Sequence, residues 1–267
     1  IRRPPRSTQS RSSAASDVYK RQLLVAGFAT RLYPLTLHTP KPLLEVGGKT
    51  ILDRLMEKVE EIPSIDEIIL VSNGRFFTTF IQWAAQYSSH RKITVLNDGA
   101  LDNDHRLGAV ADLEFAVRER NISEDTLVLA GDNLFDFSLK AFVDFFLAKR
   151  ADCITAHRVE DSEQLKRTGV ILVNSEGRVL TFEEKPKVPK SDLAVPPIYL
   201  YRQDTLPLLG TYLEEGNNPD APGNFIPWLL RRKEVYAYFF QGKRYDIGTP
   251  ESLEEARRAY AQPFPRN

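Results

Sequence analysis

The feature that most constrains the fold is a regular alternation of short apolar runs with amphipathic segments between residues 23 and 150. The apolar runs are typical of buried strands; they lie at 23–26, 67–72, 92–96 and 126–131. The amphipathic segments have apolar residues at helical spacing; they lie at 50–61, 75–87, 108–120 and 138–150. Strands that alternate with helices form βαβ units, so we expect an α/β fold with a mostly parallel sheet flanked by helices.

The pattern changes after residue 151, where shorter strand-like runs follow one another and the helical patterns become rarer. The strand-like runs lie at 151–157, 169–173, 179–184, 198–202 and 235–240, and the helical patterns at 225–232 and 251–261. A Ser-Glu-Gly-Arg turn at 175–178 indicates a hairpin. We therefore expect a smaller β-rich region in this half of the chain.

A compact loop follows the first apolar run, with the sequence GFATR at 27–31. Prolines at 34, 40 and 42 then exclude a helix interior, and Lys41 lies between the last two. Loops at strand ends can turn backbone N–H groups toward a phosphate. Arg31 offers a planar fork for phosphate oxygens and Lys41 a point charge. On these residues alone, a phosphate site and an ordinary solvated connection are equally good interpretations.

Three acidic positions follow strand-like runs or open a helix. Asp132 follows the run at 126–131, where it could bind a metal ion or simply cap a turn. Asp246 precedes a segment in which Thr249 could cap a helix that begins at Pro250. Glu184 ends another strand-like run and is followed by Lys185. Solvated charged residues are common at the ends of strands, so this pair need not have a functional role.

The segment AGFATRLYPLTLHTPKPLLEVGGKT at 26–50 resembles, without gaps, the signature of the sugar-phosphate nucleotidyltransferases, also called nucleotide-sugar pyrophosphorylases. GDN at 131–133, FEEKP at 182–186 and DIGTPE at 246–251 resemble further motifs of that family in the same order. The resemblance extends from residue 23 to about residue 256 and includes glucose-1-phosphate thymidylyltransferase and uridylyltransferase-like proteins. Ala29 and the Pro196-Pro197 pair depart from the family pattern, which usually has glycine at the first site and a small residue with glycine at the second.

The resemblance implies a Rossmann-like domain over 23–262, with a nucleotide-binding half at 23–150 and a sugar-binding half at 151–262. It implies transfer of a nucleotidyl group from an NTP to a sugar 1-phosphate, with dTTP or UTP and glucose 1-phosphate as expected substrates. Carried over position by position, catalytic roles fall on Arg31, Lys41 and Lys185. The residues that would contact the nucleotide are Ala26, Gly27, Phe28, Ala29, Thr30, Arg31, Asn97 and Gly108. Those that would contact the sugar phosphate are Gly169, Glu184 and Lys185. The residues that would bind Mg²⁺ are Asp132 and Asp246.

Three other interpretations stay open. A cytidylyltransferase acting on a phospho-alcohol such as phosphocholine would share the first loop but would not need sugar contacts at Gly169 and Glu184. A metal-dependent glycosyltransferase should have Asp-x-Asp after a strand; Asp132 lacks the second aspartate, and the DND segment at 102–104 lies in a polar loop. A non-catalytic nucleotide-sugar-binding protein would have no need of both acids and both lysines.

Residues 1–22 are rich in Arg and Ser and lack hydrophobic periodicity. Transit peptides share that composition, but DVYKRQ at 17–22 resembles the translation of a transposase adaptor used in sequencing libraries. We therefore expect these residues to be a disordered cloning or assembly artefact. They carry six basic residues and one acid, which leaves 30 basic and 35 acidic residues and a net charge of −5 in the rest of the chain. A mildly acidic domain is a poor candidate for nucleic-acid binding.

The rest of the composition limits the kinds of partner and the cellular compartment that we expect for this protein. No run of about 18 apolar residues predicts a membrane span. One cysteine, Cys153, suits a reducing compartment and a buried position, so we expect a cytoplasmic protein. The four histidines (His38, His90, His105 and His157) lack metal-ligand spacing and are expected at the surface or in loops. The expected partners are the NTP and the sugar 1-phosphate, and a homo-oligomer is compatible with the sequence.

Overall fold

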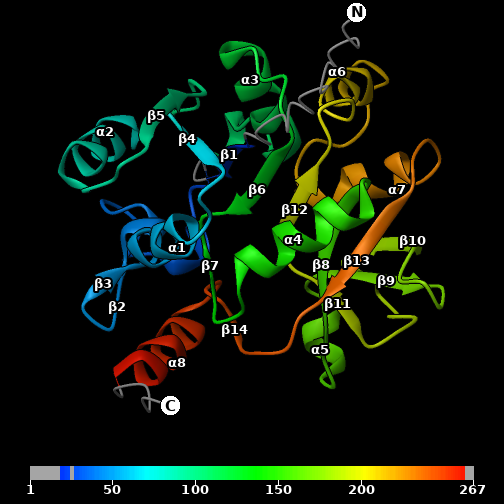
Figure 1. Cartoon of the computed structure of the whole chain (residues 1–267). Coiled ribbons are helices and arrows are strands. Elements are labelled where there is room, and N and C mark those ends of the chain that lie inside the picture. Colours follow the sequence, from blue (N-terminus) through cyan, green and yellow to red (C-terminus); the bar gives the residue numbers. More distant parts are fainter. Residues whose placement is uncertain (1–18, 25–26, 262–267) are drawn as a thin grey trace, which may run out of the picture.

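A ten-stranded mixed sheet forms the centre of the fold (Figure 1) in the computed structural model, which describes residues 19–24 and 27–261. Nine strands follow one another across the sheet in the order β10 (Val179–Glu184), β9 (Gly169–Val173), β11 (Leu193–Val195), β8 (Asp152–Arg158), β12 (Ile198–Tyr201), β6 (Thr126–Ala130), β1 (Tyr19–Leu24), β4 (Ile65–Ser72) and β5 (Lys92–Asn97). The tenth strand, β13 (Val235–Phe239), pairs with β8.

The first half of the chain forms the parallel part of this sheet, as the alternation of patterns predicts. β1 pairs in parallel with β4 and with β6, and β4 pairs in parallel with β5. Leu24 at the end of β1 pairs with Val71 of β4 and with Ala130 of β6. The carboxyl ends of these strands therefore lie at one edge of the sheet, where ligands bind in open α/β sheets.

The first strand begins earlier than the apolar run suggests. Residues 19–22, expected to belong to a disordered leader, form the first part of β1 and pair with β4 and β6. The ladder of a strand is made by backbone groups, so a central position can recruit residues whose side chains do not favour a strand. Residues 1–18 and the end of the predicted run, at 25–26, lie outside the described residues.

Helices cover both faces of the sheet. One face is covered by α1 (Ile51–Glu60), α2 (Phe77–Gln86), α4 (Leu139–Lys149) and α8 (Pro250–Ala261), and the other by α3 (Ala109–Arg120), α6 (Pro207–Glu214) and α7 (Phe225–Leu229). Side chains along β6 alternate between the two cores, with Leu127 and Leu129 in the first and Val128 in the second. Both faces are therefore dry, which explains why the strands appear in the sequence as continuous apolar runs.

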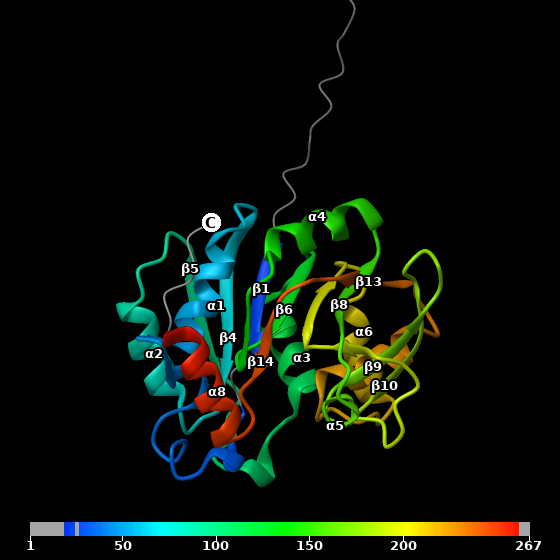
Figure 2. The ribbon, with the colours of Figure 1, turned by 90° about the horizontal axis from the view of Figure 1, so that it is seen from below.

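The second half of the chain extends the same sheet mainly through antiparallel pairs. β12 lies antiparallel between β6 and β8, and all four of its residues are buried. β11 and the short helix α5 (Ser162–Leu165) were not predicted. Figure 2 shows β8, β9 and β10 on one side of the molecule and α1, α2 and α8 on the other. The sheet is thus parallel in its first half and mixed as a whole, because neighbouring strands from β6 to β10 are antiparallel, while β13 pairs in parallel with β8.

The C-terminal segment returns to the first half of the molecule. β14 (Arg244–Asp246) pairs antiparallel with β7 (Asn133–Phe135), and α8 packs near β2 (Glu45–Val46), where Arg257 Nε donates to the Glu45 carbonyl at 3.1 Å. The start of α8 confirms the capping prediction, because the helix begins at Pro250 and Ser252 N donates to Thr249 Oγ1. Residues 244–261 therefore lie beside the half that was expected to bind the nucleotide.

The composition-based expectations have mixed outcomes. Cys153 is fully buried, as predicted. His157 is not a surface or loop residue: it belongs to β8, is half-buried and stacks on Phe240 at 4.8 Å between ring centroids. Burial, together with nearby Arg244, lowers the pKa of His157 to about 4. None of the helices in the described residues combines the length and the apolar character that crossing a membrane requires.

The buried carboxylate of Asp152 links β8 to the segment that follows β12 and to the segment that precedes β13. Asp152, at the start of β8, accepts hydrogen bonds from Arg202 N and from Thr205 Oγ1, each at 2.7 Å, and lies 3.3 Å from Lys233 Nζ. Burial raises the pKa of Asp152, and these partners oppose that rise. The carboxylate is buried and has three partners, so its loss would leave the donors Arg202 N and Thr205 Oγ1 unsatisfied and would remove one of the acceptors of Lys233 Nζ.

We expect Asp152→Ala to lower the free energy of unfolding by about 3–5 kcal/mol, because it breaks a buried charged network. Asp204→Ala is the matched control, since the exposed Asp204 contacts the same Lys233 Nζ at 2.6 Å. It should change stability by no more than about 1 kcal/mol. Urea unfolding monitored by tryptophan fluorescence measures both variants, and equal losses would show that the burial of Asp152 contributes nothing.

Candidate functional site

A cleft of about 210 Å³ opens where the ends of β6 and β14 face the ends of β9 and β10. It brings together segments that are far apart in the sequence. Six residues proposed from the sequence line it, namely Arg31, Asp132, Gly169, Glu184, Lys185 and Asp246. The other proposed residues within the described part of the chain do not line it, namely residues 27–30, Lys41, Asn97 and Gly108. Ala26 lies outside the described residues.

The loop after β1 buries Phe28 and leaves Thr30 and Arg31 exposed. Phe28 is buried with 3 % of its surface exposed, so only its backbone could face a phosphate. Ala29 has φ +50°, a left-handed conformation that glycine adopts more easily, and its carbonyl accepts from Thr36 Oγ1 at 2.8 Å. Thr30 opens a short 3₁₀ helix, η1 (Thr30–Leu32). The loop thus has the strained backbone that functional loops often hold in place.

Arg31 projects from η1 toward the turn before α8. Its side chain is exposed, and its Nη2 atom lies 3.5 Å from where a Cβ at Gly248 would be. That separation is an ordinary van der Waals contact, so the guanidinium lies directly beside this glycine. This contact joins the GFATR loop to the DIGTPE segment and directs a fixed positive charge into the cleft.

Lys41 reaches the same cleft through an ion pair. Its Nζ atom lies 2.7 Å from Asp132 Oδ2, and the lysine is buried with 7 % of its surface exposed. Asp132 Oδ1 accepts from Asn133 Nδ2 at 2.6 Å. The desolvation of Asp132 by itself would raise its pKa, but the ammonium of Lys41 more than offsets this and holds the pKa below its usual range. Asp132 is therefore ionised at neutral pH.

Arg244 organises the second acid of the cleft, and the sequence did not single it out. Its Nε donates to Asn133 Oδ1 at 2.7 Å, and its Nη2 lies 3.2 Å from Asp246 Oδ2. Only 10 % of its side chain is exposed. The β7–β14 ladder sets this contact, because it places Asp246 directly opposite Asn133. Asp132 and Asp246 thus meet at one end of the cleft with a cation attached to each.

Glu184 and Lys185 form the opposite wall. Burial raises the pKa of Glu184, and Lys185, 3.9 Å away, opposes that rise. Lys185 has φ +48°, a costly conformation for a residue with a side chain. A Cβ at Gly223 would collide with the Glu184 carboxylate, so this glycine, missed from the sequence, allows the loop before α7 to close over Glu184. A Cβ at Gly169 would instead collide with the Phe182 ring, so packing alone already requires glycine there.

The two residues proposed to contact the base lie outside this cleft. Asn97 ends β5, and its Oδ1 accepts from Gly99 N at 2.9 Å, so its amide nitrogen is the group that remains to face a ligand. Gly108 precedes α3 with φ +97°, and a Cβ there would lie 2.7 Å from the Pro219 carbonyl oxygen. The DND segment at 102–104 caps a short 3₁₀ turn through Asp102, and both of its aspartates are exposed.

Two carboxyl groups hydrogen-bond to each other between the end of β5 and the first turn of α3. They belong to Asp98 and Asp112. Burial and the Asp98 charge raise the pKa of Asp112 to about 8, and burial raises the pKa of Asp98. Such a pair shares a proton, because two adjacent carboxylates cannot both ionise at low cost.

We expect the free energy of unfolding to fall as pH rises from about 5 to 8, by up to about 1.4 kcal/mol per pH unit. The sign follows because the raised pKa of Asp112 means that the folded state binds a proton more tightly than the unfolded state in that window. Asp112→Asn should flatten the slope, and Asp104→Asn, at an exposed carboxylate, should not. Urea unfolding at several pH values would contradict the assignment if all three proteins gave parallel profiles.

The acids of the cleft suit a small divalent cation bound together with phosphate. Within the described residues, no group of three or more His, Cys, Asp or Glu side chains is arranged to hold a metal ion. Asp132 and Asp246 do line one cleft, and Mg²⁺ typically takes one or two carboxylates with phosphate oxygens and water. The donor set therefore fits Mg²⁺, which would compete with Lys41 and Arg244 for the same carboxylate oxygens.

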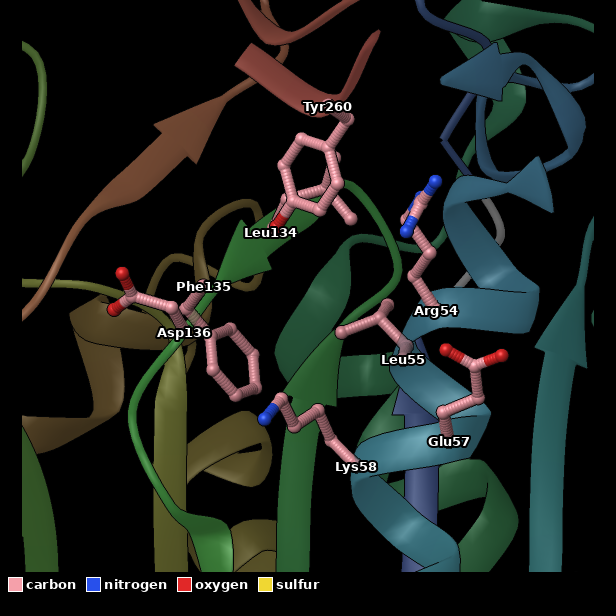
Figure 3. Close-up of a pocket in the computed structure, with 8 residues that line it drawn as sticks. All are labelled: Arg54, Leu55, Glu57, Lys58, Leu134, Phe135, Asp136 and Tyr260. Carbon is pink, nitrogen blue, oxygen red and sulfur yellow. The ribbon is translucent and has the colours of Figure 1, made fainter. Parts of the chain in front are cut away.

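A second cavity, of about 450 Å³, lies between α1, β7 and α8 (Figure 3) and contains none of the proposed site residues. Its basic groups are already engaged. Arg54 donates to the carbonyls of Val46 and Gly47, each at 2.8 Å, and lies 4.4 Å from the Tyr260 ring centroid. Lys58 lies 3.5 Å from Glu61 Oε1. This cavity therefore lacks the free cations that a phosphate site needs.

A family model described as nucleotidyl transferase matches residues 20–263. The glucose-1-phosphate adenylyltransferase of Geobacillus stearothermophilus is 31% identical over 251 residues, which cover 88% of this chain and 64% of that protein. The bifunctional protein GlmU of Methanocaldococcus jannaschii is 27% identical over 237 residues, which cover 88% of this chain and 53% of that protein. The chain thus spans between about half and two thirds of the length of these relatives.

Solved structures share the fold over nearly the whole chain. A putative glucose-1-phosphate thymidylyltransferase from Bacillus anthracis, in complex with a sucrose, has a TM-score of 0.75 at 24% identity and covers 93% of this chain and 98% of its own. A UDP-glucose pyrophosphorylase complexed with UDP-glucose has a TM-score of 0.77 at 22% identity and covers 91% and 98%. At these identities, the likeness establishes the Rossmann-like α/β fold.

Proposed function

The chain belongs to the nucleotidyl transferase family, and on that premise we propose that it transfers a nucleotidyl group from an NTP to a sugar 1-phosphate. The products would be an NDP-sugar and pyrophosphate. One observation carries the proposal. Segments that are far apart in the sequence bring Arg31, two paired acids and the Glu184–Lys185 pair to the walls of a single cleft.

The two walls suit the two substrates of such a reaction. Arg31, on the loop after β1, would bind the triphosphate and stabilise the departing pyrophosphate. On the opposite wall, Lys185 would bind the phosphate of the acceptor and Glu184 would accept hydrogen bonds from its sugar hydroxyls. The proposed contacts of Asn97 and Gly108 would bind the base, beyond the cleft.

The reaction needs positioning and charge neutralisation more than covalent chemistry from the protein. An oxygen of the acceptor phosphate attacks the α-phosphorus in line, a new P–O bond forms, and the bond to the β-phosphate oxygen breaks. Lys185 holds the nucleophile, Lys41 lies where charge develops around the α-phosphate, and Arg31 receives the leaving group. Mg²⁺ held by Asp132 and Asp246 would supply further neutralisation of phosphate charge when bound.

We propose dTTP or UTP as the donor and glucose 1-phosphate as the acceptor. The names of the two solved structures, a thymidylyltransferase and a UDP-glucose pyrophosphorylase, support this choice. The curated relative named an adenylyltransferase makes ATP the competing donor. Base selection is therefore a question that a direct comparison of nucleotides can answer.

The test is release of pyrophosphate from each of the five NTPs, with glucose 1-phosphate and Mg²⁺ present. We expect release with dTTP or UTP and its loss in Asp132→Asn, while Asp144→Asn, at an exposed carboxylate on α4, should retain it. Release with CTP and phosphocholine alone would favour the phospho-alcohol alternative. Binding of an NDP-sugar without turnover of any NTP would favour a binding protein.

We expect Arg31→Ala to lower kcat by about 10²–10³-fold, because a preorganised donor to developing charge is lost. Stability should change little, since Arg31 is exposed. Arg118→Ala, at an exposed arginine on α3 away from the cleft, is the matched control. Steady-state kinetics and thermal unfolding together measure the effect, and unchanged turnover in Arg31→Ala would remove this residue from the mechanism.

A further inference from the structure

The acids that line the cleft are neutralised by nearby cations of the protein itself. The metal-site candidates Asp132 and Asp246 pair with Lys41 at 2.7 Å and with Arg244 at 3.2 Å. Asp220, at the rim, lies 3.3 Å from Arg106 Nη2. Each of these cations is therefore committed to a carboxylate before a substrate binds.

Two guanidinium groups in the cleft are not committed in this way. Among the residues that the structure describes, the side chains of Arg31 and Arg167 both line the cleft and neither makes an ion pair or a hydrogen bond. Both side chains are exposed. They lie on different walls, because Arg31 comes from the loop after β1 and Arg167 from the turn between α5 and β9. The cleft thus offers two separate positions for anions.

Arg167 is held beside the Glu184–Lys185 wall by the backbone. Lys185 N donates to the Thr168 carbonyl at 3.1 Å, and Gly169 pairs with Glu184 across the β9–β10 ladder. Arg167 N in turn donates to the Gln164 carbonyl at 3.0 Å, at the end of α5. The backbone of Arg167 is therefore held in place next to Lys185, the lysine that the proposed function assigns to the acceptor phosphate.

The charge of a phosphomonoester shows why one lysine is not enough. A phosphate monoester carries about −1.5 to −2 charges near pH 7. Lys185 supplies one positive charge, and Glu184, 3.9 Å from its ammonium, offsets part of it. A second cation is needed to balance the acceptor, and a guanidinium suits two phosphate oxygens better than a point charge does.

We propose that Arg167 binds the phosphate of the acceptor together with Lys185, so that the site selects a dianionic phosphomonoester. This inference rests on the proposed function and assigns its acceptor subsite a residue that the sequence did not single out. Arg31 then serves the triphosphate and Arg167 the acceptor, which gives each of the two uncommitted guanidinium groups its own anion.

The test compares Arg167→Ala and Arg167→Lys with wild type, with Lys166→Ala as the matched control. Lys166 is the neighbouring exposed cation, but it lies 2.6 Å from Glu163 and does not line the cleft. We expect the KM for glucose 1-phosphate to rise roughly tenfold to a hundredfold in Arg167→Ala, the range for a lost hydrogen bond to a charged group. The KM for the NTP should stay unchanged, Arg167→Lys should recover part of the loss, and Lys166→Ala should resemble wild type.

A second measurement separates this role from a structural one. Calorimetric binding of glucose 1-phosphate between pH 5 and 7.5 should strengthen in wild type as the phosphate loses its second proton near pH 6. In Arg167→Ala this gain should be reduced, while thermal unfolding stays unchanged. An unchanged KM with an unchanged pH dependence would overturn the proposal, and so would a rise confined to the KM for the NTP.

The same experiments keep the inference distinct from the proposed function. If wild type releases no pyrophosphate but binds glucose 1-phosphate, the proposed reaction fails, and equal binding by Arg167→Ala would overturn the inference separately. If wild type binds no sugar phosphate at all, both are overturned. If wild type releases pyrophosphate and Arg167→Ala keeps the wild-type KM for glucose 1-phosphate, the reaction stands and the role of Arg167 is refuted.

Discussion

The site depends on a short antiparallel ladder between β7 and β14. Three residue pairs join segments separated by more than a hundred positions, and one of them sets Asp246 against Asn133. Asp132 precedes β7 directly, so this register brings the two acids to the same end of the cleft. The ladder also fixes Arg244, whose Nε binds Asn133. Without it, the DIGTPE segment and the GDN segment would belong to different parts of the surface.

The larger elements could be predicted from the sequence because each is specified locally. β4 and β6 are buried on both faces and appear as apolar runs, while α1 combines helical spacing with a Thr50–Asp53 capping box. β7, β11 and β14 could not be found in this way. Each has three residues, too few to show periodicity, and each is stabilised by a partner distant in the sequence.

The candidate site shows the same division. Arg31, Asp132, Glu184 and Lys185 were proposed from motifs and do line one cleft. Arg167 and Arg244 were missed, because an arginine in a polar stretch looks like a solvated side chain until the fold buries it or directs it into a cavity. Gly223 was missed for a related reason, since the closeness of Glu184 to its backbone is a fact of tertiary packing. The expected base contacts at Asn97 and Gly108 lie beyond this cleft, where loop geometry decides the outcome.

The internal pairing of acids and cations also determines what a substrate senses from a distance. Because each carboxylate of the cleft has a nearby cation, the two uncommitted guanidinium groups of Arg31 and Arg167 leave the cleft with an excess of positive charge. The field of that charge extends over a screening length of about 8 Å in physiological salt. Long-range steering, which accelerates association and fades as salt rises, needs an excess of one sign. Capture of a phosphorylated substrate here should therefore gain from attraction at a distance, and its rate should fall as ionic strength rises.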